Sequence, residues 1–171
     1  MTRRRLLPLA VLLALAPAAA GCGDDNKDST TKAATQATAT SASTTTYQTQ
    51  VQTILTSVGT AGSTLGTAAQ SSKSSADIAT ALEKFQASVK QAADQLGKLT
   101  APAQAQTGQD ELEQVLREIA DGVQPSIDAA KANNRAKFTA TFKAYQAKLD
   151  GTYRQRLTAA GAKIDQALAG Q

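Results

Sequence analysis

The sequence predicts an all-α protein, an up-down-up-down antiparallel four-helix bundle that follows a disordered tether. Apolar residues recur at spacings of three and four in four successive runs, which is the period of a helix that is buried on one face. Short polar breaks separate the runs, and short links between long amphipathic helices favour antiparallel neighbours. Ahead of the first run, residues 23–46 contain no apolar residue larger than alanine.

The chain begins with the three parts of a secretory signal, in the order that export requires. Three arginines, Arg3 to Arg5, precede an apolar stretch from Leu6 to Ala20, and small residues follow it. Pro8 and Pro17 interrupt this stretch, which falls short of the ~20 apolar residues that span a bilayer. We therefore expect residues 1–21 to be a removable signal peptide and not a membrane-spanning anchor.

Cys22, the only cysteine of the chain, directly follows that signal. The segment Ala19, Ala20, Gly21 and Cys22 resembles the lipobox of bacterial lipoproteins, although that family prefers leucine where this chain has Ala19. The resemblance implies that Cys22 is diacylated and becomes the mature N-terminus. It also implies an extracytoplasmic protein that its N-terminal lipid anchors to the cell membrane. The competing interpretation is ordinary secretion, with cleavage after Ala18 or Ala20.

Residues 22–46 are expected to hold the lipidated cysteine and a disordered linker rich in Ser, Thr and Ala. Such a segment cannot bury enough apolar surface to offset the entropy of ordering its backbone, about 1–2 kcal/mol per residue. As a flexible chain it would hold the folded region on the order of 25–30 Å from the membrane.

Four helices are expected in one domain of residues 47–171, at about 46–70, 76–99, 108–132 and 134–169. The apolar residues of the first two runs lie four and three residues apart throughout, so each run occupies one stripe of a helix. The first stripe is Tyr47, Val51, Ile54, Val58, Ala61, Leu65 and Ala68, and the second is Ile78, Leu82, Phe85, Val89, Ala92, Leu96 and Leu99.

The third and fourth runs continue this pattern. Gly122 and Pro125 predict a kink within the third helix. Asn133 and Asn134 are expected to end the third helix and to start the fourth. The two stripes are Leu112, Val115, Leu116, Ile119, Val123, Ile127 and Ala130, then Phe138, Phe142, Tyr145, Leu149, Leu157, Ala160, Ile164 and Leu168.

Polar residues at the breaks predict where the other helices start. Either Ser75 or Asp77 can cap the second helix, and Thr107 with Asp110 has the spacing of a capping box for the third. On the first helix, three glycines (Gly59, Gly62 and Gly66) are candidates for a close approach of a neighbouring helix. Each costs about 1 kcal/mol of helix propensity relative to alanine, so this helix is expected to be the least stable.

Charges of opposite sign gather on successive helices. Residues 107–133 hold six carboxylates and two cations, whereas residues 134–171 hold seven cations and two carboxylates. One interpretation is pairing between these faces within the bundle. The other is that the basic face docks on an anionic surface, such as phospholipid headgroups or a wall polymer. The candidate residues for such a contact are Lys137, Lys143, Lys148, Arg154 and Arg156.

The residue types that are missing exclude several chemistries. The chain has no histidine, and its only methionine is Met1, which excludes histidine-based catalysis and most zinc, copper and haem sites. Asp110, Glu111 and Glu113 start a helix, where carboxylates offset the helix dipole. We therefore expect no catalytic residue, no metal and no cofactor. The net charge of +4 includes Arg3 to Arg5 of the signal, so nucleic acid is not an expected partner.

The expected function is that of a membrane-anchored cell-envelope lipoprotein whose helices form a non-enzymatic binding or scaffolding module. Its partners would be membrane lipid, through the acyl anchor, and an envelope protein or an anionic polymer. Two alternatives remain open. One is a carrier that holds a small apolar ligand or lipid within the bundle, and the other is a coiled-coil-like homo-oligomeric structural protein.

Overall fold

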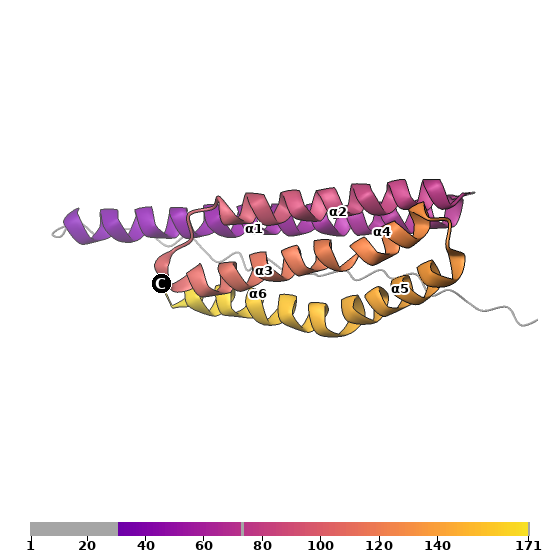
Figure 1. Ribbon diagram of the computed structural model, residues 1–171. Helices are drawn as coiled ribbons and strands as arrows, with labels where there is room; N and C mark the ends of the chain where they lie inside the picture. Colours follow the sequence, from indigo (N-terminus) through magenta and orange to yellow (C-terminus); the bar gives the residue numbers. More distant parts are fainter. Residues whose placement is uncertain (1–30, 73, 171) are drawn as a thin grey trace, which may run out of the picture. The chain divides into compact units, whose positions relative to one another are not determined.

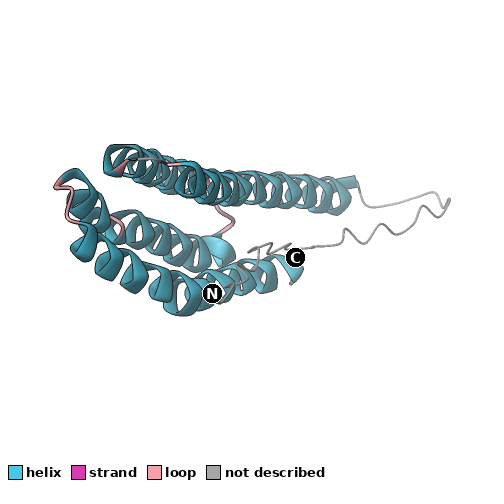
Figure 2. Ribbon diagram, turned by 90° about the vertical axis from the view of Figure 1, so that its right-hand side faces the viewer, coloured by secondary structure: helices cyan, strands magenta, loops and turns pink. Residues whose placement is uncertain are grey.

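The computed structural model describes residues 31–72 and 74–170, and the side chains from residue 43 onward within those ranges. The predicted signal peptide (1–21), Cys22 and the start of the predicted linker lie outside the described residues. All the regular elements of the described residues are helices, so the predicted all-α class is confirmed (Figure 1 and Figure 2). Residues from Lys32 onward form one compact unit.

The first helix, α1, spans Thr31–Ser71 and begins well before residue 46, where the sequence predicts its start. It therefore includes the second part of the segment that was expected to be a linker. Neither proline nor glycine occurs between Lys32 and Tyr47, and alanine, frequent there, is the strongest helix former. Nothing in this stretch ends a helix that the apolar stripe beyond it holds in place.

The N-terminus of α2 (Ser75–Gly97) is closed by a capping box one residue earlier than predicted. The hydroxyl of Ser74 accepts a hydrogen bond from the Asp77 N–H at 3.1 Å, and the Asp77 carboxylate accepts one from the Ser74 N–H at 3.1 Å. Asp77 therefore takes part in the cap, but Ser74 is the capping residue, in place of Ser75. Two backbone donors that the helix leaves unpaired are satisfied in this way.

The predicted capping box of Thr107 and Asp110 does not form. A 3₁₀ turn, η1 (Ala103–Ala105), follows Pro102 and leads directly into α3 (Gln106–Gly122), whose start has no side-chain cap. Asp110 instead accepts a hydrogen bond from the Gln106 side-chain amide at 2.8 Å. Because η1 already continues into the helix, Thr107 lies inside the first turn and not before it.

The third helical stretch bends where the sequence predicts a kink, but as two helices and not as the single kinked helix that was expected (Figure 1). α3 ends at Gly122 and α4 spans Gln124–Lys131, with Val123 between them. The N–H groups of Asn133 and Asn134 donate to the carbonyls of Ala130 and Ala129, and Asn133 has the left-handed φ of 52° typical of this helix ending.

Asn134 starts the next helix, α5 (Arg135–Lys148), by accepting a hydrogen bond from the Lys137 N–H at 3.0 Å. The predicted roles of the two asparagines are confirmed. A π-helical turn, η2 (Leu149–Tyr153), then joins α5 to α6 (Arg154–Ala169). The sequence predicts one continuous helix here, so the π turn was not expected. The spacing of the core-facing residues explains it afterwards.

Core-facing residues of this fourth stretch lie four apart at Tyr145, Leu149, Tyr153 and Leu157. A stripe with a spacing of four drifts around an α-helix, which has 3.6 residues per turn. The wider π turn takes up that drift, so both α5 and α6 keep an apolar side toward the core.

Contacts between helices follow a reversed order along the chain. Moving forward along α2, its side chains meet residues that lie progressively earlier in α4 and α3. These pairs are Ser75 with Asn133 (2.7 Å), Gln86 with Gln124 (3.0 Å) and Asp94 with Arg117 (3.0 Å). The same reversal joins Ser126 to Thr141 and Glu111 to Lys163. α3 and α4 thus lie between α2 and the α5–α6 stretch (Figure 1).

α1 packs more loosely than the other helices. Among the described residues, the closest backbone approaches join α2 to α3 and α4, and these to α6 and α5, and none of comparable extent involves α1. Its stripe is buried at Tyr47, Val51 and Ile54, but Val58 and Leu65 further along are only half-buried.

The three glycines of α1 do not serve a close helix approach. A Cβ atom built at Gly59, Gly62 or Gly66 would meet nothing within 4 Å, so all three face open space. A close approach to a neighbouring helix backbone occurs at Gly108 of α3 instead. A Cβ at Gly108 would come within 2.7 Å of Ile164 Cγ1 and 3.1 Å of the Ala160 carbonyl oxygen.

Alanine should therefore have opposite effects at two glycines. We expect Gly62→Ala to raise the free energy of unfolding by about 0.5–1 kcal/mol, because the helix gains propensity and the methyl group fits. Gly108→Ala should lower it by about 1–3 kcal/mol, because α6 has to move away. Urea denaturation followed by circular dichroism measures both changes. Equal effects of the two substitutions would contradict this packing.

Candidate functional site

The five cations that the sequence singles out fall into two groups. Arg154 pairs with Asp150 one turn earlier (3.8 Å), and Arg156 pairs with Glu118 of α3. The three lysines of α5 (Lys137, Lys143 and Lys148) are exposed, and none belongs to an ion pair within the described part of the chain. Of the candidate residues for contact with an anionic surface, only the three lysines of α5 therefore remain.

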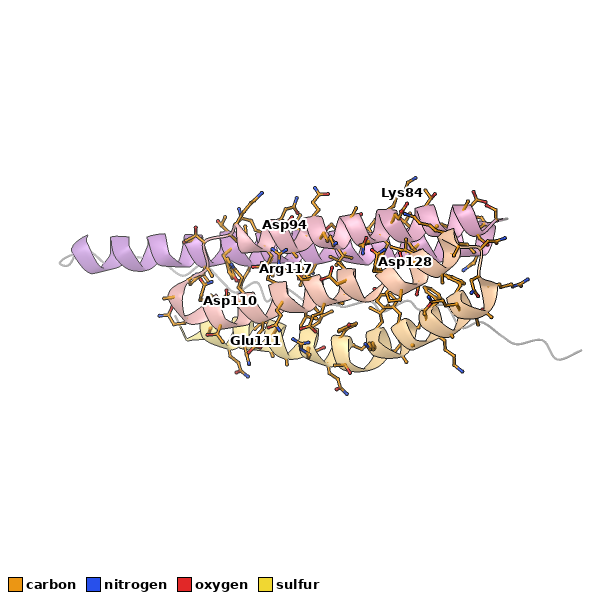
Figure 3. The ribbon with its side chains drawn as sticks, in the orientation of Figure 1. Lys84, Asp94, Asp110, Glu111, Arg117 and Asp128 are labelled. Carbon is orange, nitrogen blue, oxygen red and sulfur yellow. The ribbon has the colours of Figure 1, made fainter. Side chains whose placement is uncertain are left out.

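Most carboxylates of α3 are neutralised by neighbouring helices. Glu111 pairs with Lys163 of α6, and Asp121 pairs with Lys90 of α2 at 3.5 Å. Arg117 joins Glu113 on its own helix (2.8 Å) to Asp94 of α2 (3.0 Å), and Figure 3 shows Arg117 beside Asp94. The complementary pairing of the third and fourth helical stretches is therefore real, but it involves α6 and not α5.

These pairs lie at the surface and change the pKa of their members in the expected direction. The hydrogen bond from Arg156 lowers the pKa of Glu118, and the bond to Glu113 raises the pKa of Arg117. Exposed pairs of this kind each contribute about 0–1 kcal/mol, so they orient the helices more than they stabilise them.

The lysines of α5 lie on the side of the helix that faces away from its neighbours. Lys137 and Lys148 are eleven residues apart, about three helical turns, and so point in nearly the same direction. Lys143 lies at the opposite edge of the same side. Four exposed alanines fill the space between them: Ala136, Ala140, Ala144 and Ala147. We call these seven residues the outer face of α5.

The inner side of α5 carries aromatic residues. Tyr145 is buried, and the rings of Phe138 and Phe142 stack at a centroid distance of 5.4 Å while remaining half-buried. Both phenylalanines pack against the buried core. The aromatic side of α5 therefore packs against the core.

A proline determines the bonding of Tyr145. Pro125 has no N–H to donate to the Asp121 carbonyl, and the Val123 N–H donates to that carbonyl instead. In an unbroken helix Val123 would donate to Ile119. The Tyr145 hydroxyl donates to the Ile119 carbonyl at 3.1 Å, and so supplies the missing donor from a different helix.

Tyr153 of η2 makes a similar bond, donating its hydroxyl to the Glu118 carbonyl at 3.3 Å. Burial raises the pKa of both Tyr145 and Tyr153 above its ordinary value of 10.0. Sequence patterns did not single out Tyr153. Its spacing of four from Leu149 was the available signal.

Tyr47 differs from the other two tyrosines because its buried hydroxyl has no hydrogen-bond partner in the described residues. Burial, and then the negative charge of Asp110, raise its pKa to about 12. The side-chain oxygen of Gln109 is also buried without a partner. An open cleft of about 500 Å³ lies beside Tyr47, and Lys98 and Thr100 form part of its wall.

The described residues hold no group of three Asp, Glu, Cys or His side chains that could bind a metal ion. Over the same residues, no helix is both long and apolar enough to cross a membrane. Comparison of the chain with protein families, with curated proteins and with solved structures finds no match.

Replacing tyrosine by phenylalanine should separate the bonded from the unbonded hydroxyl. Tyr145→Phe should lower the free energy of unfolding by about 1–3 kcal/mol, because the buried Ile119 carbonyl loses its donor. Tyr47→Phe removes an unpaired hydroxyl and should leave the stability unchanged or raise it. Urea unfolding of both variants checks this, and a larger loss for Tyr47→Phe would contradict the bonding described.

Stability should fall in alkaline solution. All three tyrosines of the chain are buried, and a folded pKa above the unfolded value of 10.0 means that the folded state holds the phenolic proton more tightly. The resulting stabilisation is complete below about pH 10 and is lost as the pH rises through the folded pKa values. The urea concentration at the midpoint of unfolding should therefore be lower at about pH 11 than at about pH 9. Absorbance at the tyrosinate band should stay low until the protein unfolds.

Proposed function

We propose that this protein is a cell-envelope lipoprotein, held outside the cytoplasm by acyl chains on Cys22, whose helices act as a non-enzymatic binding module. The lipobox-like segment that ends at Cys22 supports the anchor. The outer face of α5 supports binding, because its three lysines have no carboxylate partner among the described residues, whereas the arginines of α6 are already paired. This difference between α5 and α6 is the observation that carries the proposal.

We also infer that the four helical stretches form an up-down-up-down antiparallel four-helix bundle. The reversed order of contacts between α2 and α3–α4, and between α3–α4 and α5–α6, supports this arrangement. The burial of Tyr47, Val51 and Ile54 in the common core supports the inclusion of α1. The loose packing of α1 further along suits a module that presents helix faces to partners.

The tyrosines and ion pairs fit a structural role. Tyr145 and Tyr153 donate to backbone carbonyls of α3, and Arg156 neutralises Glu118 at the same height of the bundle. Burial accounts for the raised pKa of both tyrosines, and the hydrogen bond from Arg156 accounts for the lowered pKa of Glu118. Binding through helix faces uses none of these groups as a reactant.

Cys22→Ser provides the test of the anchor. In cells that process the unchanged protein, we expect the wild-type chain to fractionate with membranes and to partition into detergent. The serine variant should lose both properties, because serine has no thiol to carry the acyl chain. Mass spectrometry of the mature N-terminus should find acyl chains on Cys22 of the wild type.

The matched control is Ser43→Ala, which lies in α1, beyond Cys22, and leaves the lipobox-like segment unchanged. It should be processed and retained like the wild type. A Cys22→Ser protein that remains membrane-bound and fully processed would show that the segment is an ordinary cleavage site and that the lipoprotein proposal is wrong.

A further inference from the structure

We propose that the outer face of α5 lies flat on the surface of a bilayer that contains anionic phospholipid. The inference names a partner for the module proposed above, and so rests on that proposal. It concerns a second contact with the membrane, separate from the acyl anchor. The residues that would meet the lipid are Lys137, Lys143 and Lys148, with the alanines between them.

The α5 helix carries a concentration of positive charge. From Ala129 to Leu149 the sequence contains five cations and no carboxylate. Of these cations, Lys131 pairs with Glu83 of α2, whereas Arg135 and the three lysines of the outer face have no ion-pair partner within the described part of the chain. Among the residues whose side chains the structure describes, the other cations without an ion-pair partner are Lys84 and Lys98, which lie on or just beyond α2. Unpaired positive charge is therefore concentrated on α5.

The shape of the outer face of α5 allows a close approach to a surface. The alanines of the outer face end at a methyl group, so the α5 backbone can approach a surface closely. The lysines stand at the edges of this alanine strip, and their long stems let the ammonium groups reach phosphates while the stems lie along the surface. Lys137 and Lys148 are separated by 11 residues, a rise of about 16 Å, so they would contact different lipid headgroups.

The proposed anchor would keep the helices near a bilayer. Cys22 lies only nine residues ahead of Thr31, where α1 begins, so an acyl chain on Cys22 would hold the start of α1 within about 30 Å of the bilayer. Each lysine near an anionic surface strengthens binding about fivefold, so the three lysines together give a contact that is measurable at low salt and that physiological salt weakens. A tether converts such a weak contact into an intramolecular one with a high effective concentration, so that three lysines suffice.

The inference can be tested without the anchor. All core residues lie between Tyr47 and Leu168, and residues from Lys32 onward form one compact unit, so a chain that starts at Gly23 keeps the whole folded region. We expect this chain to float with phosphatidylcholine vesicles that contain phosphatidylglycerol at low salt. It should not float with vesicles of phosphatidylcholine alone, and added salt should release it.

Two double variants with the same change of charge locate the contact. Lys137→Glu with Lys148→Glu should reduce vesicle binding roughly 25-fold or more. Lys84→Glu with Lys98→Glu makes the same change of charge at two exposed lysines outside α5 and is the matched control; Figure 3 shows Lys84 on α2, away from α5. The control should bind within a few-fold of the unchanged chain. Circular dichroism confirms that both variants are folded, and glutamine in place of glutamate gives a milder pair.

A single tryptophan can report the orientation, because the chain has none. Ala144→Trp places an indole on the outer face of α5, and Gln91→Trp places one at an exposed position of α2. Brominated phosphatidylglycerol vesicles should quench the fluorescence of the Ala144→Trp chain and leave that of the Gln91→Trp chain nearly unchanged.

Several outcomes would overturn the inference. Equal losses of binding in the two double variants would mean that net charge, and not α5, drives attachment. Absence of binding to anionic vesicles would exclude the bilayer, and binding to a soluble polyphosphate but not to vesicles would assign the face to a polymer. None of these results involves Cys22, which the tested chain lacks. Failure of this inference is therefore distinguishable from failure of the Cys22→Ser test.

Discussion

The missing N–H of Pro125 determines how the third and fourth helical stretches meet. The Val123 N–H satisfies the Asp121 carbonyl, and the Tyr145 hydroxyl satisfies the Ile119 carbonyl. The bend therefore does more than redirect a helix, because it makes an α5 side chain part of the backbone bonding of α3. Gly122 leaves the space for this contact, since a Cβ there would lie 3.1 Å from the Tyr153 hydroxyl and 3.4 Å from the Tyr145 ring. The π turn follows at the same height and keeps Tyr153 on the core side.

The packing of the third and fourth helical stretches leaves the cations of α6 paired and the lysines of α5 unpaired within the described residues. The carboxylates of α3 pair with cations of both neighbours, Asp121 with Lys90 of α2 and Glu111 with Lys163 of α6. Arg117 of α3 pairs in the opposite sense with Asp94 of α2. α5 packs against α4, which offers it no ion pair within the described residues. The lysines of α5 are left pointing outward for this reason. The cationic outer face is thus a consequence of which helices touch, and exposed ion pairs of modest strength are enough to separate paired from unpaired cations.

Much of the helical framework was predictable, because burial of one face imposes a spacing of three and four on the sequence. The kink before Pro125 and the roles of Asn133 and Asn134 also follow from local backbone chemistry. Other features were predicted wrongly. Ser74, not Ser75, caps α2, and η1 replaces the predicted box at Thr107. The sequence identified the cations that could contact an anionic surface but not the subset that is free to do so. It shows which residues are charged and not which of them have partners.

The sequence by itself determined the all-helical class, the apolar stripes and the breaks between them, since these depend on periodicity and on the dihedral limits of Pro, Gly and Asn. Its N-terminal segment also carries the lipobox-like resemblance at Cys22, which lies outside the described residues. Only the tertiary structure decided which glycines lie at close contacts, which tyrosine lacks a bond, and which lysines remain unpaired. Those properties belong to pairs of residues that are distant in the chain. A helical stripe shows that a face is buried, but the neighbour that covers it is set by packing.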